Sequence, residues 1–201
     1  MGYSTILDII GSMFIGGILM LSLFQVNYNT IVNMGYYNTD FLLQSGLMNL
    51  VQVIERDMRR IGYSQTVGVI NSTYDAIIQA DTSSITIVGD VDNSGTVDTV
   101  KYYLGPTGEM AVTVNPRDRY LYRQVNGGTP QKIFFGVTIF SLVYYDPFNG
   151  VIPSPLPRAE TGRISSIQIS LQVESGDAYD LKYADVYWRQ IRLSSKNLNN
   201  R

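Results

Sequence analysis

The chain has 201 residues, a formal net charge of −2, and neither cysteine nor histidine. The missing cysteines exclude a disulfide framework and thiolate metal sites, and the missing histidines exclude a histidine-dependent catalytic triad. A net charge of −2 gives no broad attraction to nucleic acid, so we predict that the chain does not bind it. The sequence has no convincing nucleophile–base set, so we also predict that the chain is not an enzyme and has no small-molecule substrate.

The N-terminal part of the chain is apolar. Residues 9–39 contain no Asp, Glu, Lys or Arg. As a helix, residues 6–26 are long enough to cross the roughly 30 Å hydrocarbon core of a bilayer. Ser12 and Gly16, with Gly17 beside them, give the small-x-x-x-small spacing that lets two helices approach closely in an apolar medium. The segment is therefore predicted to lie in a membrane or in a tightly packed apolar bundle.

A second helical pattern follows. Large aliphatic residues recur at steps of three and four, at Leu43, Leu47, Leu50, Ile54, Met58 and Ile61. This spacing predicts an amphipathic helix with one buried stripe, which ends at Gly62. Asp40 is a candidate N-cap if the helix restarts there, but the Asn and Thr before it also allow one helix over residues 5–61, about 85 Å long. A helix of that length needs partners along much of its surface.

After Gly62 the apolar pattern has a period of two, which predicts strands. The predicted strands cover residues 85–88, 97–104, 120–125, 131–135, 136–145, 166–173 and 187–193, and the proline-rich residues 146–162 form a loop. A helix followed by strands predicts an α+β fold in which a long N-terminal helix packs on an antiparallel sheet. The predicted parts are an apolar helix half at 1–40 and a globular domain at 41–201, which comprises the helix half 41–62, the sheet 63–193 and a polar tail 194–201.

One loop has the ligand spacing of a calcium site. Oxygen ligands stand at alternate positions, and a glycine at the sharp turn, in Asp90, Asp92, Ser94, Gly95 and Asp98. The twelfth position, which carries a bidentate Glu in an EF-hand, is Lys101 here, and no predicted helix flanks the loop. A calcium site and a plain polar hairpin turn are both compatible with this pattern, and no other cofactor is predicted.

Two groups of charged residues are predicted to form solvated ion pairs. The first is Asp57 with Arg59 and Arg60, and the second is the run Arg117, Asp118 and Arg119. Trp188, the single tryptophan, is predicted to lie in the core or to anchor a sheet face.

The order of these features resembles the type IV pilin and type II secretion pseudopilin superfamily, in which a long N-terminal helix, apolar and then amphipathic, precedes an antiparallel sheet. Finer features are similar to the large J-type pseudopilins and W-type minor pilins. They are the helix end ERDMRRIGY at 55–63, the hairpin at 89–104, the strand with Gly-Val, Phe and Tyr-Tyr at 136–145, and the closing strands at 164–173 and 186–193. The resemblance covers most of the chain.

The resemblance implies a structural subunit of a bacterial type IV pilus-like or secretion filament, assembled by bundling of N-terminal helices. The implied partners are copies of the chain or other pilin-like subunits. The implied location is the cytoplasmic membrane, as a single-pass protein, before assembly and a periplasmic or extracellular filament afterwards. The J-type likeness favours a place at the filament tip, and the long helix favours the shaft. The alternative is a single-pass protein whose β domain acts as a surface binding module.

The N-terminus departs from the pilin pattern, because it has no basic leader and no Glu at the fifth mature position. Gly2 could precede a leader cut that makes Tyr3 the new N-terminus, or Met1 persists. In pilins an acid at the edge of the apolar segment pairs with the N-terminal amine of a neighbour. The resemblance therefore implies that Asp8 pairs with an α-amino group, its own or a neighbour's; helix capping or a place among lipid headgroups is the alternative.

Overall fold

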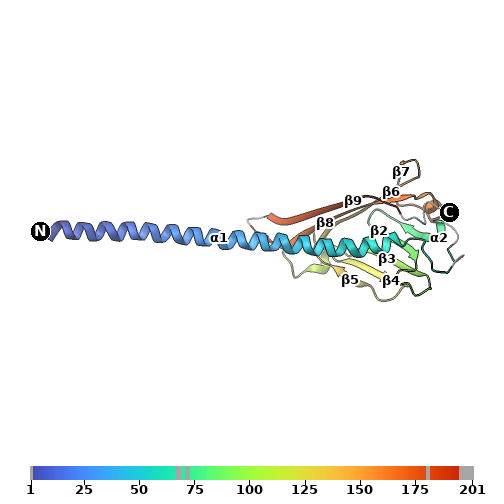
Figure 1. The fold of residues 1–201 in the computed structure, drawn as a ribbon, viewed down its shortest axis with the longest axis horizontal. Helices are drawn as coiled ribbons and strands as arrows, with labels where there is room; N and C mark the ends of the chain where they lie inside the picture. The colour runs from blue at the N-terminus through green and yellow to red at the C-terminus, as the bar shows by residue number, and fades with distance from the viewer. Residues whose placement is uncertain (1, 67–68, 71–72, 180–181, 195–201) are drawn as a thin grey trace. The chain divides into compact units, whose positions relative to one another are not determined.

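The computed structural model describes residues 2–66, 69–70, 73–179 and 182–194, so all of the predicted polar tail except Ser194 lies outside the described residues. By its internal contacts the chain divides into two compact units, Met1–Phe41 and Leu42–Arg201. One helix, α1 (Gly2–Arg59), makes up the described part of the first unit and opens the second (Figure 1). The predicted long helix is therefore confirmed, and it does not restart at Asp40.

In the first unit the described side chains are exposed or half-buried, and none is buried. The backbone polar groups of a helix bond within the helix, so such a segment brings few unsatisfied groups into an apolar medium. Three of its hydroxyls also bond within the helix. Ser12 Oγ donates to the carbonyl of Ile9, Ser22 Oγ to that of Ile18, and Thr30 Oγ1 to that of Val26, at 2.8–2.9 Å.

In the second unit α1 carries the predicted apolar stripe. The buried residues of the helix are Leu47, Leu50, Val51, Ile54, Asp57 and Met58. The helix ends at Arg59, and Gly62 follows in the left-handed region, with φ of 70°. The amide of Gly62 donates to the carbonyl of Val88 at 2.8 Å. Gly62 therefore turns the chain from the helix toward the sheet, as predicted.

The described residues form two antiparallel sheets. The first has the order β1-β2-β3-β4-β5, with β1 (Ile77–Ala80), β2 (Ser84–Gly89), β3 (Asp98–Leu104), β4 (Leu121–Val125) and β5 (Gln131–Phe134). The second has the order β7-β6-β8-β9, with β6 (Val137–Tyr145), β7 (Val151–Ile152), β8 (Ser166–Tyr179) and β9 (Lys182–Leu193). Three short helical segments complete the described elements: α2 (Thr73–Ala76) precedes β1, η1 (Thr107–Met110) lies between β3 and β4, and η2 (Arg158–Arg163) lies between β7 and β8. The predicted α+β class is confirmed.

The single sheet of the prediction is divided in two. The chain leaves the first sheet after β5 and enters the second at β6, and Gly136 between them has φ of 75°. A Cβ at Gly136 would lie 2.7 Å from the carbonyl oxygen of Glu174 on β8, so the backbones approach too closely for another residue. The strands of the hairpins β2–β3 and β4–β5 were all predicted, and each pair is antiparallel.

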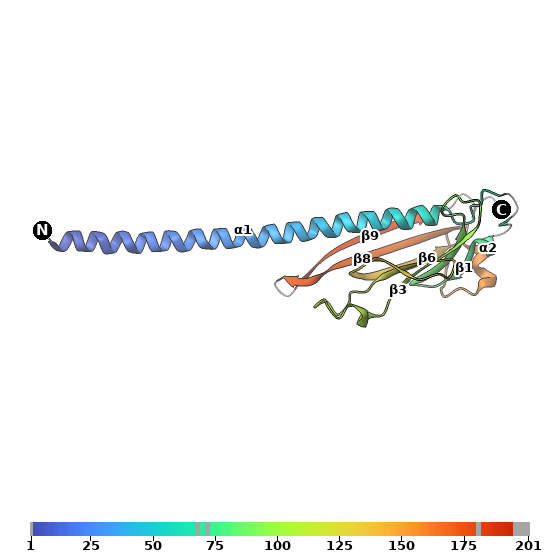
Figure 2. The same ribbon diagram turned by 90° about the horizontal axis from the view of Figure 1, so that it is seen from below.

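One core joins the helix and both sheets. Figure 2 shows the second unit with the end of α1 running along the sheets. Its fully buried side chains include Ile54 and Met58 of α1, Tyr102 of the first sheet, and Tyr144 and Leu142 of the second. Trp188 on β9 is half-buried and packs against this core, as predicted.

Candidate functional site

The first feature that points to function is the surface of α1 in the first unit. From Tyr3 to Val26 every large apolar side chain is at least 50% exposed. These side chains lie all round the helix and not along one stripe. The helix is long and apolar enough to cross a membrane, and none of its most apolar window is buried. A helix of this kind requires lipid or apolar protein around it, because water in contact with so much apolar surface is unfavourable.

The predicted assembly residues share part of this surface. Asp8, Ser12 and Gly16 stand four residues apart and therefore on one face of α1, and Gly17 lies about 100° further round. Asp8 is exposed, and a Cβ added at Gly16 or Gly17 would meet nothing within 4 Å. The structure thus brings Asp8, Ser12 and Gly16 to one side of the helix, whereas Gly17 lies on the side away from Asp8.

At the start of α1, Tyr3 is 88% exposed. Gly2 is the first residue of the helix. Leader cleavage between them stays a prediction.

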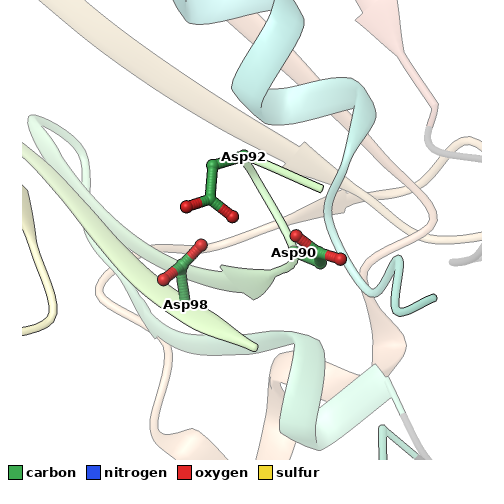
Figure 3. Close-up of side chains that lie close together, drawn as sticks. All are labelled: Asp90, Asp92 and Asp98. Atoms are coloured by element: carbon green, nitrogen blue, oxygen red, sulfur yellow. The ribbon is translucent and has the colours of Figure 1, made fainter. Parts of the chain in front are cut away.

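The second feature is the acidic loop between β2 and β3. Asp90, Asp92 and Asp98 each offer a carboxylate oxygen, and these oxygens lie within 4.8 Å of one another. Figure 3 shows the side chains of Asp92 and Asp98 turned toward each other, with Asp90 beside them. Calcium binds oxygen at 2.3–2.6 Å, so ligands on one ion stand up to about 5 Å apart. The three carboxylates fit a shared cation in this respect.

The same carboxylates already bind backbone amides of the loop. Asp90 accepts from the amides of Ser94 and Gly95, both at 3.0 Å, and Asp92 accepts from that of Ser94 at 2.9 Å. Hydrogen bonding by Ser94, from its side chain first and its amide second, lowers the pKa of Asp92. Asp98 accepts from the amide of Val91 at 3.3 Å. These bonds hold the loop as a polar hairpin turn, and the calcium site stays a prediction.

The other predicted positions of the loop contribute little to a site. The Ser94 hydroxyl bonds the hydroxyl of Thr96 at 2.7 Å. Lys101 lies over the ring of Tyr103, 5.3 Å from its centroid. Because Asp98 and Lys101 are an odd number of residues apart on β3, they face opposite sides of the sheet. Lys101 therefore neither supplies a ligand nor places its charge among the three carboxylates.

Two further residues complete the loop and were missed in the sequence. Arg60, just after α1, donates to the backbone carbonyls of Asp90 and Val91. Asn126 donates to Asp98 at 2.7 Å and accepts from the amide of Thr99 at 2.8 Å. Asn126 has φ of 51°, and the Asn126–Gly127 pair is a turn signal in the sequence, but nothing there links it to Asp98.

The prediction of a solvated ion pair at Asp57 is wrong, because Asp57 is fully buried. Its Oδ2 accepts from the hydroxyl of Tyr102 at 2.6 Å and from Nε of Arg123 at 2.7 Å. Burial, and next the charge of Asp57, raise the pKa of Tyr102 above its ordinary value. The carboxylate thus joins α1 to β3 and β4 in the interior.

The prediction at Arg117, Asp118 and Arg119 is also wrong for the carboxylate. Asp118 is fully buried, and neither of its oxygens has a hydrogen-bond partner among the described residues. Arg117 instead pairs with Glu174 at 2.9 Å, and Arg119 donates to the carbonyl of Thr138 at 2.8 Å. Asp118 therefore forms no ion pair with Arg117 or Arg119, its neighbours in the sequence.

No protein-family model matches the chain, and no curated protein matches its sequence.

Proposed function

We propose that this chain is a structural subunit of a pilus-like or secretion filament, held in the cytoplasmic membrane by the first half of α1 before assembly. The observation that carries the proposal is the exposed apolar surface of α1 from Tyr3 to Val26. Lipid covers this surface in the single subunit, and the helices of neighbouring subunits cover it in the filament. Extraction from the membrane then exchanges lipid contacts for helix contacts of similar apolarity.

The polar groups of this half agree with an apolar surrounding. The hydroxyls of Ser12 and Ser22 bond carbonyls of their own helix, so they bring no unsatisfied donor into hydrocarbon. The open space beside Gly16 and Gly17 lets a second helix approach at this face. Asp8, on the face of Ser12 and Gly16, is the charge to be neutralised there, and an α-amino group is the partner that we propose.

Cysteine substitution tests this proposal cleanly, because the chain has no cysteine of its own. We would introduce Ser12→Cys, on the face that Ser12 shares with Gly16. The comparison variant is Phe14→Cys, because Phe14 is 71% exposed and lies about 200° further round the helix. In the full chain in membranes, oxidation should give a disulfide-linked dimer with Ser12→Cys and much less with Phe14→Cys. Electron microscopy of the same cells should find filaments whose traced density matches this sequence.

The control is Thr107→Cys, on the exposed surface of the second unit, which should react with a water-soluble thiol reagent in every state. Asp8→Ala should reduce assembly, and intact assembly would overturn the pairing of Asp8. Membrane-bound chain that never cross-links and never forms filaments would instead favour a single-pass surface binding module. Chain that does not fractionate with membranes or filaments would overturn both.

A further inference from the structure

The segment of α1 that joins its apolar half to its packed half is a weak helix. Residues 25–40 contain four Asn, three Tyr, two Thr, two Val, one Ile, one Gly and one Asp, so fourteen of the sixteen are poor helix formers. The other two are Gln and Met, and there is no Ala, Leu, Lys, Arg or Glu. Intrinsic preference therefore does not hold this segment as a helix in water.

Ion pairs and burial give this segment little support. Asp40 is the single charged residue of the segment, so no side chains of opposite charge pair along the helix within it. Every side chain of the segment is exposed or half-buried, and Ile31, Met34 and Tyr37 are each at least 65% exposed. The hydroxyl of Thr30 bonds back to the carbonyl of Val26, a contact that bends helices and does not strengthen them.

The flanking parts of α1 are each supported in another way. Of residues 41–59, eleven of nineteen are good helix formers, and this part buries Leu50, Ile54 and Met58 in the core. Residues 6–24 are apolar enough for a membrane, in which a helix satisfies its own backbone. A poor helix former between two well-supported stretches is the part that opens first.

We propose that residues 25–40 are a hinge in the single subunit and become a stable helix when neighbouring subunits pack against them. The hinge itself follows from composition and exposure alone; the packing step rests on the proposed function. Sixteen residues span about 24 Å as a helix and up to about 54 Å extended, so opening more than doubles the length that this segment can bridge. A subunit in the membrane can then present its globular unit over a range of positions before it joins a filament.

Hydrogen exchange of the full chain in detergent micelles tests the hinge. Amides of residues 27–40 should exchange within about tenfold of the unstructured rate, whereas those of the buried stripe, residues 47–58, should exchange at least about a thousandfold more slowly. The matched variant combines Asn33→Ala, Gly35→Ala and Asn38→Ala. Alanine fits at Gly35, where a Cβ meets nothing within 4 Å, so this variant should slow exchange of the segment at least about tenfold.

Paired spin labels give a second readout. Labels at Leu23→Cys and Gln44→Cys should give a broad distance distribution in micelles, against a single value of about 32 Å for an unbroken helix. Labels at Ile6→Cys and Leu23→Cys, within the apolar half, should give a narrow distribution near about 26 Å and serve as the control.

The outcomes separate the hinge from the packing step and from the proposed function. Slow exchange of residues 27–40 in micelles, or a narrow distribution for the Leu23–Gln44 label pair, would overturn the hinge and leave the filament proposal standing. Fast exchange that persists in isolated filaments would overturn the packing step. Failure to form filaments, with fast exchange in micelles, would overturn the proposed function and the packing step but support the hinge.

Discussion

The carboxylate of Asp57 on α1 accepts a hydrogen bond from Nε of Arg123 on β4 at 2.7 Å, and the side chain of Asp57 is fully buried. The hydroxyl of Tyr102 donates to the same oxygen at 2.6 Å. Two residues that are 66 positions apart in the sequence thus neutralise each other inside the protein. Removal of one partner of a buried ion pair leaves the other charge uncompensated, which strongly destabilises the folded state.

Loss of Asp57 should therefore destabilise the second unit strongly. Asp57→Ala leaves the guanidinium of Arg123, whose side chain is only 15% exposed, without its anion, and we expect a decrease of about 3–5 kcal/mol in the free energy of unfolding. Denaturation of the full chain in mild detergent, followed by the fluorescence of Trp188, measures it. Arg59→Ala is the control, because Arg59 is 61% exposed and pairs with Glu55 at the surface, so its loss should change stability by about 0.5 kcal/mol or less. A decrease below about 1 kcal/mol for Asp57→Ala would contradict the role of this pair.

Gly89 should tolerate no larger residue. A Cβ at this position would overlap the backbone carbonyl oxygen of Arg60, which cannot rotate away as a side chain can. We expect Gly89→Ala to lower the free energy of unfolding by about 1–3 kcal/mol or more. Gly108→Ala is the matched control, because a Cβ there meets nothing within 4 Å, and its stability should stay within about 1 kcal/mol of the parent chain. Equal melting temperatures for the two variants would count against the close approach.

The acidic loop should be stable without a metal. Asp90 accepts hydrogen bonds from the amides of Ser94 and Gly95, so chelation with EDTA should leave the denaturation midpoint unchanged. Asp90→Ala removes both acceptors, and we expect a decrease of about 1–3 kcal/mol in the free energy of unfolding. A midpoint that rises with millimolar calcium, and does so less in Asp98→Asn, would establish the predicted calcium site. No heat in a calorimetric titration with calcium would remove it.

Alkaline pH should destabilise the second unit through Tyr122. Burial, and next the hydrogen bond to Glu109, raise the pKa of Tyr122 from 10.0 to about 12. Between these values the unfolded chain loses the proton first, so the contribution of Tyr122 to the free energy of unfolding should be constant below pH 10 and fall as pH rises from 10 to 12. Tyr122→Phe should weaken this dependence, which denaturation midpoints at several pH values measure. An unchanged slope in the variant would refute the assignment to Tyr122.

The sequence predicted the elements whose signals are local. The stripe from Leu43 to Met58, the stop at Gly62 and the hairpin formed by β2 and β3 are each encoded within a few turns or a few strand residues. The strands β1, with four residues, and β7, with two, were missed, as were the short helical segments α2, η1 and η2. The strands β8 and β9 are longer than predicted, because Gly176 and Asp177 look like a turn in the sequence but lie within β8.

The site could be predicted only in part, because several of its contacts join residues that are distant in the sequence. The acidic residues of the β2–β3 loop follow from their spacing, but Asn126 reaches Asp98 across 28 residues, and periodicity carries no information on such pairs. The burial of Asp57 is likewise set by Tyr102 and Arg123, which are distant in sequence. The split into two sheets depends on how strands pair, and alternation of apolar residues fixes only which face of a strand is inward.

The chain just after α1 is clamped to the end of β2 by two bonds, from the amide of Gly62 to Val88 and from the amide of Asp90 to Tyr63, each 2.8 Å long. The buried carboxylate of Asp57 lies one turn before this clamp. A mechanical load carried along the end of the helix would therefore be shared by several bonds in parallel, and they would have to break together before the strands could peel apart.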